Sequence, residues 1–410
     1  MSEPTNQAPA TPPKRTQTTS AQAIKKTTAA PSRPVDDDRE GWKGYWTLQG
    51  QPWRTEPEID EERQKFLAER RVITPDIEKS IYSFKDIKLG RADVEWLLAT
   101  HEHGHGPVLW NDPAQRSREG LDLRGADLRQ ADLRSLPLSR LRGGLTRHDW
   151  GHATEEQHAL AAVQMEGTVL RGAHLEEAIL IRAHMEKADL RDTHLEGAFL
   201  SRAYLEKIDL WRAHLEGSIL TRTHLEGAFL DDVILSDETH VGPQLAGAYW
   251  NDVDLSVVKW SQVEMLGDEH EARQKTHRGK AKESSVRIAR YEKAVGANRQ
   301  LAVMLQTQGL NEVSDHFTYH AHLCQRVVFR LQRQWLKYAF SWLLAVLTGY
   351  GYRMGRIIIA YVLAICGFAS LYYSLGGEPN ARVGVACVQR SIREYGGRCT
   401  QGARARSATT

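Results

Sequence analysis

Residues 170–190 read LRGAHLEEAILIRAHMEKADL, with one large apolar residue at every fifth position. The same spacing runs from Met165 to Leu235 and resumes from Leu245 to Trp260. On an α-helix, five residues turn by about 500°, so the leucines would spread around the whole cylinder. On a flat strand, an odd spacing would place them alternately on opposite faces. The spacing therefore predicts a chain that turns a corner every five residues and winds as a solenoid with the leucines inside.

A small residue stands two positions before most of these leucines, as at Ala173, Ala178 and Ala183. A narrow interior requires this, because close packing leaves no room for two large side chains side by side. An earlier block at 121–140, LDLRGADLRQADLRSLPLSR, follows the same pattern. The units AHLEE, ADLRD and AHLEG resemble the pentapeptide-repeat family, whose pattern is A-(D/N)-L-x-x, and the chain is identified as a bacterial, membrane-anchored member. The resemblance implies a right-handed, four-sided β-helix with four pentapeptides per coil.

These patterns together predict the fold class and the domain boundaries. The expected fold is a mainly β solenoid, the right-handed quadrilateral pentapeptide-repeat β-helix, with an N-terminal helical cap, a C-terminal α-helical hairpin and one transmembrane helix. The predicted segments are a disordered tail at 1–40, a mainly helical cap at 41–120, the β-helix at 121–260 with an insertion at 141–162, a helical hairpin at 261–336, a membrane segment at 337–376 with its span at 357–375, and a disordered basic tail at 377–410.

The net charge of +2 conceals two regions of opposite charge. Residues 163–260 contain 17 acidic and 9 basic side chains, whereas residues 261–410 contain 10 acidic and 21 basic ones. The four cysteines are too few for a disulfide scaffold. No Ser-His-Asp set, P-loop, dinucleotide fingerprint or zinc spacing stands in a supporting context. The sequence therefore predicts a protein that is not an enzyme and that has no catalytic, cofactor-binding or metal-binding residues.

Histidine and glutamate alternate around the inward residues with a period of ten. With twenty residues per coil, one face carries a column of imidazoles and carboxylates, the opposite face carries a similar column, and a column of arginines follows a corner. The candidate interaction face comprises His174, His194, His214, Glu176, Glu196, Glu216, Arg182, Arg202 and Arg222; the opposite column comprises His184, Tyr204 and His224. Neighbouring coils are about 4.8 Å apart, so like groups face each other closely. Two interpretations stay open: His and Glu satisfy each other in solvent, or the columns form an electrostatic stripe that binds a cationic partner or responds to pH.

Two further segments invite a functional interpretation. The run His101-Glu102-His103-Gly104-His105 places imidazoles at alternate positions, as in some metal sites, but a polar loop is favoured because no Cys or other His lies nearby in the sequence. The insertion at 141–162 is polar and contains glycines, so it is expected on the surface as either a binding loop or a linker.

The sequence of the C-terminal region predicts a membrane anchor. Residues 357–375 contain nineteen residues without a charge, preceded by Arg353 and Arg356. The alternative is a buried core helix. Residues 347–351, LTGYG, resemble a potassium-channel filter but are better explained as a glycine turn. With the N-terminal region and solenoid in the cytoplasm, Cys387 and Cys399 would lie in a compartment that permits a disulfide.

The expected function is a non-enzymatic, membrane-anchored scaffold or protein-interaction module that presents the solenoid to the cytoplasm. One alternative is an acidic DNA mimic that inhibits a type II topoisomerase, as the family resemblance suggests, and another is a subunit of a channel-like membrane assembly. The expected partners are membrane lipid at the C-terminal helix and an unidentified protein. A homodimer is also considered, and no direct nucleic-acid binding is expected.

Overall fold

The computed structural model describes residues 33–35, 38–146, 148–274, 276–277, 280–281, 283–347 and 354–374. The two predicted tails lie almost wholly outside the described residues, as do the Thr348–Gly351 turn and the Cys387–Cys399 pair. The chain divides into two compact units, Met1–Glu58 and Ile59–Thr410.

The first unit is built on helix α1, Arg39–Leu48. Asp38 caps this helix, because its carboxylate accepts a hydrogen bond from the backbone N–H of Gly41 at 2.9 Å. Trp42 and Trp46 are buried on one side, and the Arg54 guanidinium lies 3.6 Å from the Trp46 ring centroid. Aromatic burial and this cation–π contact hold the short unit together.

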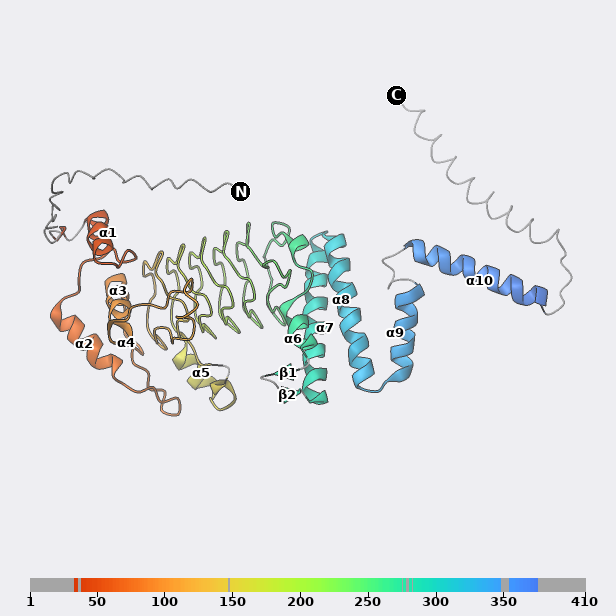
Figure 1. The fold of residues 1–410 in the computed structure, drawn as a ribbon, viewed down its shortest axis with the longest axis horizontal. Coiled ribbons are helices and arrows are strands. Elements are labelled where there is room, and N and C mark those ends of the chain that lie inside the picture. The colour runs from red at the N-terminus through yellow and green to blue at the C-terminus, as the bar shows by residue number, and fades with distance from the viewer. Residues whose placement is uncertain are drawn as a thin grey trace, which may run out of the picture. The chain divides into compact units, whose positions relative to one another are not determined.

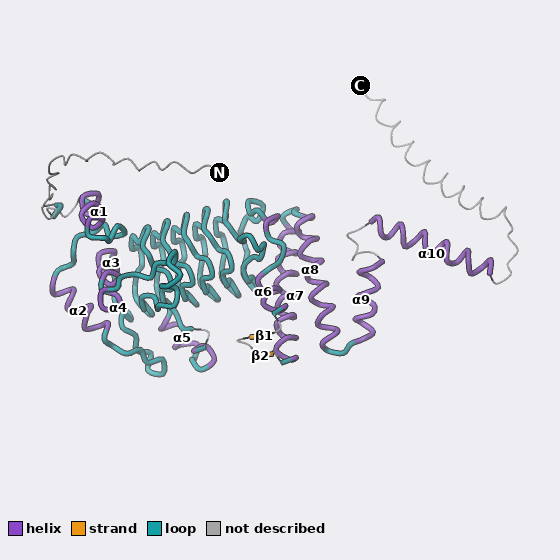
Figure 2. Tube along the Cα trace, in the orientation of Figure 1, coloured by secondary structure: helices purple, strands orange, loops and turns teal. Residues whose placement is uncertain are grey.

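In the second unit, residues 121–260 form a stack of coils, seen edge-on in Figures 1 and 2. Each corner is a four-residue turn. At Leu175–Ala178 the backbone N–H of Ala178 donates to the carbonyl of Leu175 at 3.0 Å, and Glu177 between them has φ +52°. The next coil repeats this turn with Gly197 at φ +67° in the same position. A positive φ at the third residue is typical of a type II turn, which bends the chain once per pentapeptide.

Consecutive coils are joined by isolated parallel bridges, which connect residues twenty positions apart wherever no insertion or irregular stretch intervenes. His174 pairs with His194, and His194 pairs with His214. The N–H of Leu175 donates to the carbonyl of His194 at 2.7 Å, and the N–H of His194 donates to Ala173 at 3.0 Å. The inward leucines are buried, with Leu175 and Leu195 0% exposed, which confirms the predicted interior.

The predicted mainly β fold class is wrong. The bridges between coils are isolated residue pairs, because each straight segment is interrupted by a turn before a second pair can form. Within the described residues, the strands are β1, Thr276–His277, and β2, Lys280–Ala281, which pair antiparallel. The remaining regular elements are helices, so the chain combines a stack of turns with α-helical segments rather than a sheet-built solenoid.

Helices α2, Glu61–Arg71, α3, Arg91–Ala99, and α4, His101–Gly104, precede the coil stack. Lys88 forms a parallel bridge with Asp127, so the chain ahead of α3 adds to the first coils. The buried Arg91 donates to the backbone carbonyls of Asp132 and Arg134 at 3.2 and 3.0 Å and pairs with Glu95 at 2.7 Å. These contacts satisfy backbone groups at the N-terminal end of the stack, where a solenoid otherwise exposes them.

The insertion forms the short 3-10 helix η1, Asp149–Gly151, and helix α5, Glu155–Ala161. At the other end of the stack lie a second 3-10 helix, η2, Trp260–Gln262, and helix α6, Gly267–Arg273. They are followed by α7, Ser284–Thr307, and α8, Asn311–Leu331, which pack on each other.

Helix α7 is hydrogen-bonded to the last coils. Gln300 Nε2 donates to the carbonyl of Ala248 at 2.6 Å. Gln308 accepts from the N–H of Leu255 at 2.8 Å and donates to the carbonyl of Val253 at 2.6 Å. Side chains of α7 and of its C-cap residue Gln308 therefore satisfy backbone groups of the last coils.

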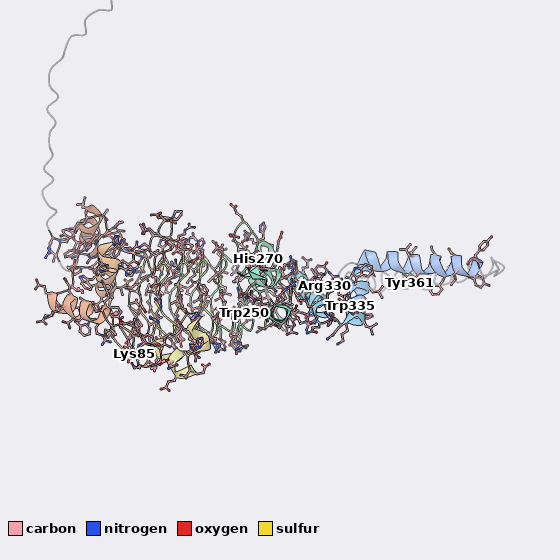
Figure 3. All side chains as sticks on the ribbon, turned by 60° about the horizontal axis from the view of Figure 1, so that its bottom comes forward. Lys85, Trp250, His270, Arg330, Trp335 and Tyr361 are labelled. Atoms are coloured by element: carbon pink, nitrogen blue, oxygen red, sulfur yellow. The ribbon has the colours of Figure 1, made fainter. Side chains whose placement is uncertain are left out.

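The last helices are α9, Trp335–Leu347, and α10, Met354–Ser374. Trp250 in the coil stack is 5% exposed, whereas Tyr361 on α10 is 69% exposed. Both residues are labelled in Figure 3. Among the described residues, no helix is both long enough and apolar enough to cross a bilayer. The predicted transmembrane helix at 357–375 and the single-pass membrane localisation are therefore wrong, and the channel-like alternative depended on both.

Candidate functional site

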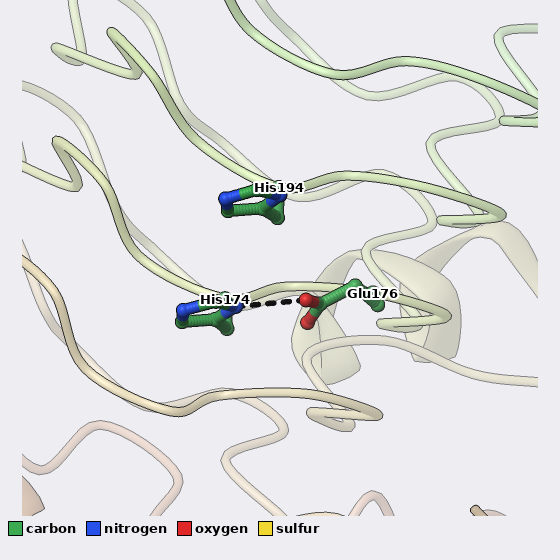
Figure 4. Close-up of side chains that lie close together, drawn as sticks. All are labelled: His174, Glu176 and His194. Atoms are coloured by element: carbon green, nitrogen blue, oxygen red, sulfur yellow. Dashed lines mark hydrogen bonds and ion pairs between the residues drawn. The ribbon is translucent and has the colours of Figure 1, made fainter. Parts of the chain in front are cut away.

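The predicted histidines on one face form an ordered column. The rings of His174 and His194 stack with centroids 4.7 Å apart and planes 3° from parallel, and His194 and His214 stack at 4.7 Å and 20°. Figure 4 shows the first pair with Glu176 beside His174. We call His174, His194 and His214, together with Glu176, Glu196 and Glu216, the His174 column.

Each imidazole in this column is held by the carboxylate two residues later. The Nδ1–Oε1 distances are 2.8 Å for His174 and Glu176, 3.0 Å for His194 and Glu196, and 3.3 Å for His214 and Glu216. Because Nδ1 faces the carboxylate, Nε2 lies on the other edge of each ring. The hydrogen bond to Glu196 raises the pKa of His194, although burial opposes this.

The carboxylates of the column differ in their surroundings. Burial alone would raise the pKa of Glu176, but hydrogen bonds from His174 and from the Ser139 hydroxyl at 2.6 Å lower it. Burial raises the pKa of Glu216, and the Oε2 atoms of Glu196 and Glu216 are buried without a hydrogen-bond donor from another described residue. Glu176 thus has two side-chain hydrogen-bond partners, whereas Glu216 has one among the described residues, the imidazole of His214.

A second column lies on another face and is longer than predicted. The rings of His184, Tyr204, His224 and Tyr249 stack in sequence at 4.5, 5.1 and 4.4 Å. We call this the His184 column. Tyr204 stands where the repeat otherwise has histidine, so Glu206 lacks an imidazole in its own coil, and burial together with the charge of Glu186 raises the pKa of Glu206. Tyr249 was missed because an irregular stretch around His240 shifts the register from twenty to twenty-five residues.

Both columns contain groups that could hold a metal ion. In the part of the chain that the structure describes, four sets of ligand atoms lie within 4.8 Å of one another: His174, Glu176 and His194; His194, Glu196 and His214; Glu166, His184 and Glu186; and Glu206, His224 and Glu226. Parallel rings direct their nitrogen lone pairs side by side rather than toward one point, which is unlike a tetrahedral site. A metal ion would also have to replace the His–Glu hydrogen bonds described above.

The predicted arginine column lies at a corner of the coils. Arg182, Arg202 and Arg222 have φ of +61°, +58° and +57°, which are the corner positions of their turns. Arg182 and Arg202 both form ion pairs with Glu155 of α5, the second at 3.4 Å. The insertion is thereby held against the coils by a charge contact that sequence reasoning did not assign.

Trp150 of the insertion also contacts this column. Its ring stacks on His158 of α5 with centroids 3.7 Å apart, and the Arg202 guanidinium lies 4.7 Å from its centroid. The column, the insertion and helix α7 border an open cavity of about 530 Å³, lined by Trp150, Ile181, Ser201, Arg202, Thr221, Arg222, Ala246, Gly247, Lys293, Gly296, Ala297 and Gln300. The predicted face thus separates into two sites: the histidines and glutamates form one, and Arg202 and Arg222 belong to the other.

The His101–His105 segment is structured around other contacts. His101 Nε2 lies 2.9 Å from the carbonyl of Glu119, and His105 Nδ1 lies 2.5 Å from the carbonyl of Glu102. Glu102 also pairs with Arg118 at 2.7 Å. Among the described residues, these imidazoles belong to none of the sets with clustered metal-ligand atoms.

The family model for pentapeptide repeats matches residues 160–197 and 198–237. Residues 160–237 are pentapeptide repeats. No curated protein matches the chain.

Solved structures with some similarity to this chain include the following three. A pentapeptide-repeat protein of the Arabidopsis thaliana thylakoid lumen is 22% identical, over 33% of this chain and 66% of that one, with a TM-score of 0.14. Rfr23 from the cyanobacterium Cyanothece is 23% identical, over 33% and 86%, with a TM-score of 0.16. A variant of QnrB1, a plasmid-mediated fluoroquinolone resistance protein, is 18% identical, over 32% and 62%, with a TM-score of 0.13.

Proposed function

We propose that this pentapeptide-repeat protein is a non-enzymatic scaffold that binds a protein partner through the His174 column. The observation that carries the proposal is the parallel stacking of three imidazoles at 4.7 Å, each fixed by its own carboxylate. Side chains that are already ordered lose little conformational entropy when a partner binds. The column is thus a flat surface with ring edges at regular intervals.

The charge of the region indicates the chemistry of the partner. Residues 163–260 carry 17 acidic and 9 basic side chains, a net charge of −8. A partner surface bearing Lys or Arg side chains would complement this net negative charge. A second copy of this chain is one candidate, because its region 261–410 carries 21 basic and 10 acidic side chains.

The DNA-mimic alternative is less well supported by the contacts of the acidic residues. A mimic of DNA must present uncompensated charge at regular spacing. Here Asp189 is paired with Arg171 at 3.0 Å and with Arg191 at 2.6 Å. The glutamates of the His174 column are engaged with imidazoles. The acidic side chains are therefore largely committed to contacts within the protein.

The proposal is tested by comparing two sets of variants in a cross-linking experiment. The triple variant His174→Gln, His194→Gln, His214→Gln changes the proposed face, and His184→Gln with His224→Gln is the matched control on the other column. Cross-linked partners are identified by mass spectrometry, and light scattering of the purified protein reports self-association. We expect one defined partner to be captured by wild type and control and lost from the triple variant. Capture of the same proteins by all three would overturn the proposal.

A further inference from the structure

The cavity between the arginine column and helix α7 has the size of a ligand site. Its volume is about 530 Å³, within the range of about 300–1,000 Å³ that small-molecule pockets occupy. Small residues on both walls keep it open, with Ala246 and Gly247 on the coils and Gly296 and Ala297 on α7. A Cβ atom added at Gly296 would meet no heavy atom within 4 Å, so the space beside it is empty.

The charged side chains that line this cavity are all basic. They are Arg202, Arg222 and Lys293, and the described residues that line the cavity include no acidic side chain. Lys293 Nζ lies 3.0 Å from the buried Asp268 carboxylate, which offsets one of these charges. Arg202 stacks on Trp150 and makes a 3.4 Å contact with Glu155, whose side chain is 70% exposed. Both contacts orient the guanidinium without burying its charge.

Arg222 is the least compensated of the three. Its side chain is exposed, and no hydrogen bond or ion pair of its guanidinium is found with the described residues. It occupies the corner one coil beyond Arg202, so the two guanidiniums come from equivalent positions of adjacent coils. Two planar guanidiniums on adjacent coils are suited to the oxygen atoms of a phosphate group, which accept paired hydrogen bonds.

The remaining lining is apolar. Ile181, Ala246, Ala297 and part of Trp150 contribute carbon surface next to the basic groups. A small inorganic anion would leave most of this surface and volume unfilled. The combination of a charged side and an apolar side therefore selects for a molecule that has both an anionic group and an organic body.

We propose that this cavity binds an organic phosphate of about mononucleotide size, with its phosphate between Arg202 and Arg222 and its organic part against Ile181 and Ala297. Such a ligand would contact the insertion, the coils and α7 together. Because it binds only the folded arrangement of these three segments, its binding also raises the thermal stability of the protein. This site is separate from the His174 column and does not depend on the proposed scaffold function.

The test uses the full-length protein and isothermal titration calorimetry with AMP as the probe. Arg222→Gln removes the uncompensated charge, and Gly296→Leu fills the empty space on α7. Arg212→Gln is the matched control, because Arg212 also occupies a corner with positive φ but pairs with Asp192 away from this cavity. Thermal melts followed by circular dichroism establish that each variant is folded.

We expect AMP to bind wild type and Arg212→Gln equally, Arg222→Gln about tenfold more weakly, as loss of one charge-assisted hydrogen bond would produce, and Gly296→Leu not measurably. Adenosine should bind at least about tenfold more weakly than AMP for the same reason. Three outcomes would overturn the proposal: no binding of AMP at millimolar concentration, equal binding by wild type and Arg222→Gln, or equal affinity for AMP and adenosine. Equal affinity for inorganic phosphate and AMP would also overturn it, because the apolar side would then have no role.

Discussion

His174 and His194 stack with their ring planes 3° from parallel, although twenty residues separate them along the chain. The parallel bridge between the same two residues sets this geometry, because it aligns their backbones and therefore their Cβ atoms. Any group that the repeat places at this position is presented again one coil later at nearly the same angle. A partner that contacts one ring consequently meets the same chemistry at its neighbour.

The ionisation of His194 should depend on its own carboxylate. The hydrogen bond to Glu196 raises the pKa of His194, with smaller contributions from Glu176 and Glu216. The stacked rings of His174 and His214 face it from the adjacent coils. We expect Glu196→Gln to lower the pKa of His194 in an NMR titration of its ring protons. Glu186→Gln, in the other column, is the control and should leave that pKa unchanged.

The raised pKa of His194 also decides how the free energy of unfolding should change with pH. Because the folded pKa of His194 lies above its unfolded value of about 6.5, this pair stabilises the fold fully below about pH 6.5 and loses its contribution as pH rises through the folded pKa. The difference in unfolding free energy between wild type and Glu196→Gln should therefore narrow as pH rises. A difference that grows with pH would contradict this assignment.

A buried carboxylate in the C-terminal helices should contribute to stability with a pH dependence opposite to that of the His194–Glu196 pair. Glu269 of α6 is buried, which alone would raise its pKa, but His320 at 2.9 Å and Arg273 at 2.5 Å lower it. Glu269→Gln should cost about 2 kcal/mol at pH 7, because it removes charge-assisted hydrogen bonds from a buried site. Urea denaturation measures this cost.

The effect of Glu269→Gln should shrink in acid. The lowered pKa of Glu269 means that its contribution is present above its unfolded pKa of about 4.3 and is lost as pH falls through the folded value. Glu264→Gln, at an exposed position nearby in the sequence, is the control and should change stability little at either pH. A cost for Glu269→Gln that is equal at pH 7 and pH 3 would show that the ion pairs are not its source.

The sequence was sufficient to predict the interior and the stacking, because both follow from periodicity alone. Leu175, Leu195 and their equivalents are buried, and His174 lies over His194 as the twenty-residue spacing requires. The β class was wrong because the same five-residue period that buries the leucines also places a turn in every pentapeptide, which leaves one bridge where a strand was expected.

The cavity could not be predicted from the sequence. Trp150, Arg222 and Lys293 are separated by seventy residues or more, and neither the insertion nor α7 follows the repeat period. A repeat pattern fixes which residues lie above one another, but it does not say which corner a non-repeating segment covers. Only the charge of the Arg182, Arg202 and Arg222 column gave a signal, and this indicated a charged surface rather than a cavity with an apolar side.

Two glycines with equally open surroundings should respond oppositely to alanine. A Cβ atom at Gly217 or at Gly296 would meet no heavy atom within 4 Å. Gly217 has φ +65°, where an L-residue is strained, so Gly217→Ala should destabilise by about 1 kcal/mol. Gly296 lies inside α7 with ordinary helical backbone, so Gly296→Ala should stabilise by about 0.5–1 kcal/mol. Chemical denaturation of both variants tests the turn geometry directly, since changes of the same sign would mean that φ does not decide the outcome.

The two cysteines within the described residues should differ strongly in reactivity. Cys324 is buried in the α7–α8 core with Tyr291 and Val295, and burial, with the nearby Glu269 charge, raises the pKa of its thiol. Cys366 on α10 is exposed. Because the thiolate is the reactive species, iodoacetamide should modify Cys366 first and Cys324 on the order of 100-fold more slowly, through opening of the helical core. Peptide mass spectrometry gives both modification rates from one sample. In urea the two rates should become similar, because unfolding exposes Cys324. If Cys324 reacts as fast as Cys366 without denaturant, the α7–α8 core opens readily and cannot form a stable wall for the cavity beside Gly296.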